Sequence, residues 1–128
     1  RYQLTGVVVA GERLGRKLGF PTANMQLYNP LKAIPAFGVY AVTAEVEGRV
    51  YAGVCNIGIR PTVSNKESVS IETHILSFNE DIYGLDLKVS FLQKLRDERR
   101  FPSTDALVEQ MKMDKIAALE IVSAAQSI

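Results

Sequence analysis

Cysteine, histidine and tryptophan are nearly missing from this sequence. Its 128 residues contain one Cys, one His and no Trp. The single cysteine, Cys55, cannot form a disulfide within the chain, so a reducing compartment such as the cytoplasm is the expected location. One Cys and one His also cannot supply the ligands of a structural zinc site. These shortages exclude disulfide-stapled scaffolds and zinc modules.

The chain also lacks an excess of charge and a long apolar run. It has 15 Lys and Arg against 14 Asp and Glu, a net charge of +1, whereas domains that coat nucleic acid usually carry a strong basic excess. No apolar run approaches the roughly 20 residues that span a bilayer, and no signal peptide opens the chain. We therefore expect a soluble protein with neither a nucleic-acid nor a membrane partner. Because the chain starts at Arg1 and enters a strand-like stretch at once, we expect it to be part of a longer protein.

The residues that are present favour one domain rich in β-structure. A length of 128 residues with 47% hydrophobic side chains is enough for a single core. Alternating stretches separated by glycine-containing turns predict strands at 2–9, 38–46, 49–57, 69–78 and 86–95. The second and third of these should form a hairpin that turns at Glu47-Gly48. Two strands show an apolar face, made by Tyr40, Val42, Ala44 and Val46 in one and by Leu87, Val89, Phe91 and Leu95 in the other.

Helical spacing begins beyond residue 102. Ser103 is the predicted N-cap, Asp105 suits the first turn, and apolar residues recur from Leu107 onward. A helix over about 103–125 is expected, and Asp114 is a point at which it could break. Several short strands followed by one helix indicate a closed or nearly closed β-barrel, about residues 1–100, within a single domain of residues 1–128.

A loop rich in glycine and cations follows the first strand. Its glycines recur every four residues, so backbone N–H groups can approach an anion with no Cβ in the way. They are Gly11, Gly15 and Gly19. Three cations within the loop add positive charge where phosphates would lie. The loop has neither a Walker A nor a Rossmann pattern.

Thr22 and Asn24 close this loop two positions apart. In extended backbone their side-chain oxygens point the same way, and a hydroxyl and an amide oxygen are hard ligands that suit Mg²⁺. The plain alternative is a solvated basic turn, ending in an ordinary turn with an asparagine side-chain hydrogen bond. Spacing alone leaves both interpretations open.

The segment Gly15–Asn24, Gly-Arg-Lys-Leu-Gly-Phe-Pro-Thr-Ala-Asn, resembles the signature of riboflavin kinases, including the C-terminal module of bacterial bifunctional FAD synthetases. The resemblance continues in ordered blocks at 38–40, 56–62, 71–76, 81–84 and 95–101. It implies a mainly β fold, a closed six-stranded antiparallel Greek-key β-barrel with a C-terminal helix. It also implies a kinase that phosphorylates the ribityl 5′-hydroxyl of riboflavin with ATP, giving FMN and ADP, with Mg²⁺ or another divalent cation as cofactor. The full-length chain should then carry an N-terminal FMN adenylyltransferase domain.

The same resemblance implies site residues. Glu72 would be the catalytic base that accepts the proton of the attacking hydroxyl; the plain alternative for a strand glutamate is an outward cross-strand ion pair. The metal would lie on Thr22 and Asn24. The nucleotide would contact Gly11, Arg16, Gly19, Thr22, Ile75, Ser77 and Tyr83. Tyr83 could equally be an aromatic side chain packed in the barrel.

The block Arg96–Phe101 is the implied flavin site. An isoalloxazine ring is a flat π-surface with polar edges, so Phe101 can stack on it, and Arg96 or Arg99 can cover a face or bind its edge. The block could also be a charged connection in which Phe101 anchors the helix to the barrel. The two interpretations are compatible.

Two other classes of function compete with a kinase. A non-catalytic barrel could bind flavin, another ligand or nucleic acid, but nucleic-acid binding predicts basic patches with interleaved aromatics. The charge here is balanced and the aromatics fall at core-like positions or beside turns. An FMN-carrying oxidoreductase barrel would have no use for Mg·ATP or for Glu72.

Overall fold

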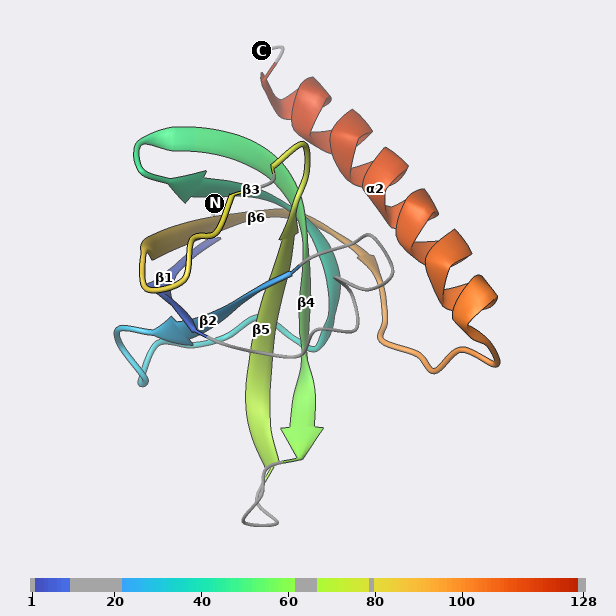
Figure 1. The fold of residues 1–128 in the computed structure, drawn as a ribbon, viewed down its shortest axis with the longest axis horizontal. Coiled ribbons are helices and arrows are strands. Elements are labelled where there is room, and N and C mark those ends of the chain that lie inside the picture. The colour runs from blue at the N-terminus through green and yellow to red at the C-terminus, as the bar shows by residue number, and fades with distance from the viewer. Residues whose placement is uncertain (1, 10–21, 62–66, 79, 127–128) are drawn as a thin grey trace.

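Strands with alternating apolar residues close into a barrel in this protein. The computed structural model describes residues 2–9, 22–61, 67–78 and 80–126. Within them, antiparallel strands close in the order β1-β2-β5-β4-β3-β6, and helix α2 lies along one side (Figure 1). The elements are β1 (Tyr2–Val9), β2 (Ala23–Leu27), β3 (Gly38–Val46), β4 (Arg49–Pro61), β5 (Glu67–Ile75), β6 (Asp86–Arg96) and α2 (Thr104–Gln126). The closed six-stranded antiparallel barrel with a C-terminal helix, which the resemblance implied, is confirmed.

One apolar cluster fills the inside of the barrel. Alternate residues of the strands point inward, and Leu4, Val42, Ile57, Leu87 and Val89 are completely enclosed. Burial of such side chains stabilises the fold by roughly 1.5–3 kcal/mol each. Because side chains fill the interior, any chemistry has to take place on the outer wall or at the ends of the barrel.

The β3–β4 hairpin turns where the sequence predicts. Glu47 and Gly48 have φ angles of 51° and 78°, the left-handed pair that a two-residue type I′ turn requires. Val46 and Arg49 pair on either side of them. The predicted hairpin is confirmed, and β4 continues beyond the expected end at 57 to Pro61.

Two strand features differ from expectation. The segment Ala23–Leu27 was not predicted as a strand, but it pairs with β1 on one side and with β5 on the other. On β6 the register against β3 shifts twice, and each such irregularity changes which face the following residues occupy. Leu95 therefore packs with Ala41 and Leu76 beneath the helix, and its predicted place on the face of Phe91 is wrong.

Cys55 lies inside the barrel, completely buried and opposite Thr73. Burial raises the pKa of the Cys55 thiol to about 12; the Thr73 side chain opposes this rise and the negative charge of Glu72 adds to it. Because the thiolate is the reactive form, we expect DTNB at pH 8 to leave the folded protein unlabelled and to react with one thiol per chain after unfolding. Labelling of the folded protein at the rate of a free thiol would show that the barrel opens around β4.

Helix α2 starts at the predicted cap. The backbone N–H of Ala106 donates to Ser103 Oγ at 3.1 Å, and Ala118 packs against Ala41 and Leu76 on the outside of the barrel. The helix runs unbroken through Asp114, so the expected break is wrong. No helix in the described part of the chain is long and apolar enough to cross a membrane.

Candidate active site

A row of residues crosses the outer wall of the barrel at one level. Direct register partners run from Asn24 on β2 to Glu72 on β5, and on to Asn56, Val39 and Arg96. The sequence neighbours of the first four belong to the barrel interior, so these side chains point outward. Arg96 also points outward, because it pairs with helix α2. Adjacent strands are about 4.8 Å apart, so the row spans roughly 19 Å.

Glu72 and Asn24 form one end of this row. Glu72 is half-buried, and Asn24 opposite it is 8% exposed. Directly opposed side chains have Cβ atoms about 5 Å apart, so the carboxylate and the amide can reach one small ligand together. Thr22, also half-buried, lies two residues before Asn24 at the entry to β2.

The donors at this end fit a hydrated divalent cation bound to phosphate. Thr22 and Asn24 offer neutral oxygens, which suit Mg²⁺ when water and phosphate oxygens complete its shell. Among the described residues, no group of three or more His, Cys, Asp or Glu side chains could hold a metal. Thr22 and Asn24 are thus candidate ligands for a cation whose remaining ligands are water and phosphate oxygens.

Polar groups continue along the same wall beside Glu72. Asn56 faces Glu72 from β4, and Ser70 lies two residues before it on β5. In the described structure, Asn56 Oδ1 and Ser70 Oγ are buried and have no hydrogen-bond partner. The Glu98 carboxylate lies against Gly58, which is opposite Ser70, in space that any Cβ would occupy.

The far end of the row is held by a buried ion pair. Arg96 donates to Asp114 through Nε at 3.1 Å and Nη2 at 2.9 Å. The two side chains are 20% and 6% exposed, and Gln110 Nε2 donates to Asp114 Oδ1 at 3.0 Å. This geometry fixes the start of the Arg96–Phe101 segment to the middle of helix α2.

Two guanidiniums flank the ring of Phe101 at this end. The central carbon of Arg99 lies 4.8 Å from the ring centroid, and that of Arg96 lies 5.5 Å away. Arg99 also donates to Gln110 Oε1 at 2.8 Å. The segment thus places two guanidinium groups close to an aromatic ring, and groups of both kinds can stack on a planar ligand.

Exposed charges in and beside this segment are paired. Lys94 Nζ lies 2.6 Å from Asp97 Oδ1. The hydrogen bond that Lys94 donates to Asp97 lowers the pKa of Asp97, and the same hydrogen bond raises the pKa of Lys94. Both charges therefore persist at neutral pH at this edge of the site.

Comparison with known proteins shows the family of this chain. The family model described as riboflavin kinase (flavokinase) matches residues 1–122. The chain belongs to the riboflavin kinase family. It is 44% identical over 124 residues to the bifunctional riboflavin kinase/FMN adenylyltransferase of Bacillus subtilis, covering 95% of this chain and 39% of that protein. The chain thus spans well under half the length of this relative, and the family expected from the sequence is confirmed.

Solved structures support the riboflavin kinase fold. Riboflavin kinase from Trypanosoma brucei superposes with a TM-score of 0.64 at 28% identity, over 97% of this chain and 81% of that one. A crystal structure described as a macrolide-efflux protein from Streptococcus pneumoniae superposes with a TM-score of 0.83 at 37% identity, over 91% of this chain and 38% of that one. The kinase interpretation is therefore favoured over a non-catalytic flavin-binding barrel.

The riboflavin kinase residues expected at the nucleotide lie in several places. Gly11, Arg16 and Gly19 fall outside the described residues. Ile75 is 4% exposed in the barrel interior, so only its backbone can face outward. Ser77, with φ of 55°, is exposed in the turn after β5.

Tyr83 lies at the end of the barrel where β1 finishes. Its side chain is 66% exposed, which rules out the packed-aromatic alternative. The next residue, Gly84, donates its N–H to Val8 O at 2.9 Å. Val9 in turn pairs with Asn24, so the turn that carries Tyr83 lies at the same end of the barrel as the proposed metal ligands.

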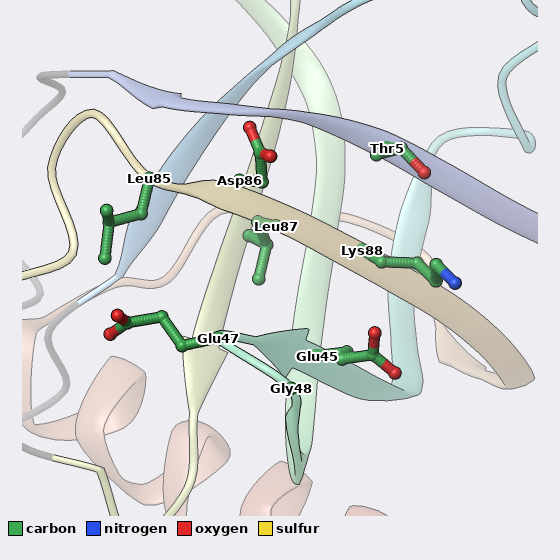
Figure 2. Close-up of a pocket in the computed structure, with 8 residues that line it drawn as sticks. All are labelled: Thr5, Glu45, Glu47, Gly48, Leu85, Asp86, Leu87 and Lys88. Atoms are coloured by element: carbon green, nitrogen blue, oxygen red, sulfur yellow. The ribbon is translucent and has the colours of Figure 1, made fainter.

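A depression is lined by residues of β1, of the β3–β4 hairpin and of the start of β6, none of which was assigned to the riboflavin kinase site (Figure 2). It has a volume of about 430 Å³, and it is lined by Thr5, Glu45, Glu47, Gly48, Leu85, Asp86, Leu87 and Lys88. Lys88 is directly opposite Glu45 across the β3–β6 pair, and Asp86 accepts a hydrogen bond from the Tyr28 hydroxyl, which raises the pKa of Tyr28. Three carboxylates against one cation repel phosphate, so this depression does not suit a nucleotide.

Sequence reasoning assigned no role to four residues in or beside the candidate site. Asn56, Ser70 and Glu98 received no role, although each lies in or next to a block that carries the family resemblance. For Asn56 and Ser70 the signal is a polar residue at an outward position of a strand whose inward neighbours are apolar, whereas Glu98 lies in the connection after β6 and has no such pattern. The fourth, Asp114, lies at the buried centre of an otherwise apolar helix face, which signals a partner elsewhere in the fold.

Proposed function

We propose that this domain transfers the γ-phosphate of ATP to the ribityl 5′-hydroxyl of riboflavin, giving FMN and ADP. The observation that carries the proposal is the row across the outer wall, which joins a carboxylate, oxygen donors for a cation and a cationic aromatic segment at one level. Glu72 and Arg96 are three strand spacings apart, roughly 14 Å. That separation suits a substrate with a flat ring at one end and a reactive hydroxyl at the other.

Each part of the row has a task in phosphoryl transfer. Glu72 accepts the proton of the attacking hydroxyl, which must lie within hydrogen-bonding reach of the carboxylate. Thr22 and Asn24 hold the cation, which when bound neutralises charge on the phosphates. Arg96, Arg99 and Phe101 bind the isoalloxazine ring. Gly11, Arg16, Gly19, Ile75, Ser77 and Tyr83 are proposed to contact the nucleotide.

The direct test is synthesis of FMN. Purified protein is incubated with riboflavin, ATP and Mg²⁺, and the products are separated by chromatography. We expect FMN and ADP in equal amounts, and no FMN when ATP or the divalent cation is left out. Riboflavin binding without any FMN would instead support a non-catalytic flavin-binding barrel.

The proposed metal ligands can be tested through Thr22. Replacing Thr22 by Ala removes one hydroxyl, and we expect the Mg²⁺ concentration for half-maximal rate to rise roughly 10-fold or more. Thr5→Ala is the matched control, because this exposed strand threonine borders the acidic depression instead. An identical Mg²⁺ dependence in Thr22→Ala and the unmodified protein would remove Thr22 from the metal site.

The whole protein would do more than this domain. The Bacillus subtilis relative is bifunctional, and we propose that the full-length chain carries an FMN adenylyltransferase domain as well. FMN made here would then be converted to FAD by the same polypeptide. We place both reactions in the cytoplasm, in keeping with the single buried thiol.

A further inference from the structure

Helix α2 holds both of the arginines that flank the ring of Phe101. Arg96 is paired with Asp114, and Arg99 donates from Nη2 to Gln110 Oε1 at 2.8 Å. Gln110 and Asp114 are four residues apart and therefore lie on the same face of the helix, where Gln110 Nε2 donates to Asp114 Oδ1 at 3.0 Å. The two arginines and these two helix residues thus form one continuous hydrogen-bonded network.

The amide of Gln110 has only one orientation that suits this network. An ionised carboxylate accepts hydrogen bonds and a guanidinium only donates them, whereas a side-chain amide has one group of each kind. The NH₂ group of Gln110 therefore faces Asp114, which leaves the amide oxygen to accept from Arg99. Asp114 thus fixes how Gln110 meets Arg99.

The contact between Gln110 and Arg99 contributes little to the stability of the fold. Arg99 is exposed, and it lies in a connection, residues 97–101, that has no regular secondary structure. An exposed hydrogen bond is formed in exchange for bonds to water, so its net gain is small. Ordering a long arginine side chain also costs conformational entropy. This contact is better explained by its effect on a ligand than by its effect on the fold.

A guanidinium that is held in advance favours a ligand that binds against it. The central carbon of Arg99 lies 4.8 Å from the centroid of the Phe101 ring, and a planar guanidinium can stack on a flat ligand or bind its edge. A side chain that becomes ordered only on binding subtracts its lost entropy from the binding free energy, and a side chain ordered beforehand avoids this loss. The bond from Gln110 therefore prepares Arg99 for a planar ligand.

We propose that Gln110 is a positioning residue for the flavin ring: with its amide oriented by Asp114, it holds the Arg99 guanidinium in place before the ligand binds. The inference rests on the proposed function, which assigns the ring to the segment that carries Arg99 and Phe101. Gln110 acts only through Arg99 and does not contact the ring itself. It raises the affinity for any flavin with this ring system, and it has no part in proton transfer at Glu72, at the other end of the row.

The test removes the amide of Gln110 with little change in size. Gln110→Met keeps an unbranched side chain with a similar helix propensity, but methionine cannot bond Arg99 and Asp114 as the amide does. Dissociation constants are measured for riboflavin, for lumiflavin, which has the ring without the ribityl chain, and for Mg·ADP. We expect the affinity for both flavins to fall roughly 3- to 10-fold, the effect of one lost hydrogen bond. The affinity for Mg·ADP and the turnover at saturating riboflavin should stay the same.

A double-mutant cycle distinguishes positioning from a general disturbance of the helix. Because Gln110 acts through Arg99 in this proposal, its replacement should have no further effect once the guanidinium is gone. Arg99→Met and Arg99→Met/Gln110→Met should therefore bind riboflavin equally well. A purely structural role of Gln110 would lower the affinity by the same factor in both backgrounds.

A conservative variant separates ligand affinity from stability. In Gln110→Glu the new carboxylate still accepts from Arg99, but it repels the carboxylate of Asp114. We therefore expect a lower Tm than in the unmodified protein, together with riboflavin affinity within about 2-fold of it. A residue with only a structural role would lose affinity and stability together.

Glu109→Met is the matched control, since Glu109 is the neighbour of Gln110 on the helix and forms an exposed pair with Lys112 at 3.7 Å. It should leave the affinities for both flavins and for Mg·ADP unchanged. Unchanged flavin affinity in Gln110→Met, or additive losses in the cycle with Arg99, would overturn the inference. Failure of the proposed function looks different, because the unmodified protein would then make no FMN, whatever its affinity for flavins.

Discussion

Replacing Glu72 by Gln is expected to lower the turnover for FMN formation by about 10²- to 10⁴-fold, the usual effect of losing a general base. Glutamine keeps the size of the side chain but cannot accept the proton of the attacking hydroxyl. Because Glu72 is half-buried beside Asn24 and Asn56, the neutral amide fits the same place. Dissociation constants for riboflavin and Mg·ADP should therefore change little, and single-turnover kinetics would locate the loss in the chemical step.

A second strand glutamate provides the control. Glu45 is also half-buried and points outward from its strand, but it lies opposite Lys88 at the acidic depression. Glu45→Gln should leave turnover within about 2-fold of the unmodified protein, as for an ordinary surface substitution. Equal turnover in Glu72→Gln and Glu45→Gln would exclude Glu72 as the base.

Removing the carboxylate of Asp114 is expected to destabilise the protein by roughly 3 kcal/mol, at the lower end of the cost of breaking a buried pair. The Asp114 side chain is buried and bonds both Arg96 and Gln110. Asp114→Ala leaves the Arg96 guanidinium without its partner while it remains largely buried. For a domain of this size the Tm should fall by roughly 10 °C.

An exposed pair on the same helix shows how much of this effect is specific. Glu109 lies 3.7 Å from Lys112, and both are well exposed, so Glu109→Ala should change stability by less than about 1 kcal/mol. The double variant Arg96→Met/Asp114→Leu should regain much of the lost stability, because packed apolar side chains often replace a buried pair without loss. A Tm of Asp114→Ala equal to that of Glu109→Ala would show that the pair contributes little.

Much of the fold could be predicted because local patterns and tertiary structure agree. The alternating strands 2–9 and 38–46, the Glu47-Gly48 turn and the Ser103 cap each depend on neighbours in sequence, and each is found. The strand at Ala23–Leu27 could not be predicted, since its pairing with β5 comes from far along the chain. Leu95 was assigned to the wrong face because the shifts in β6 depend on its partner β3.

The candidate site could be predicted in type but not in arrangement. The family resemblance named Glu72, Thr22 and Asn24, and only the register shows that Glu72 stands between Asn24 and Asn56. Asp114 was read as a helix breaker because its partner, Arg96, is 18 residues away. A charged residue on an apolar helix face indicates the end of a helix only when no residue elsewhere in the fold pairs with it.

Because the proposed reactive groups lie on strands of a closed barrel, the length of these strands can hardly change during evolution. In such a strand, one inserted or deleted residue moves every following side chain to the opposite face of the sheet. Such a change in β5 before Glu72 would bury the Glu72 carboxylate and expose Thr73. Changes of length within β5 and β4 should therefore be lethal to activity, whereas the connections between strands remain open to growth and trimming. Insertions and deletions among related domains should therefore fall in the loops at the two ends of the barrel.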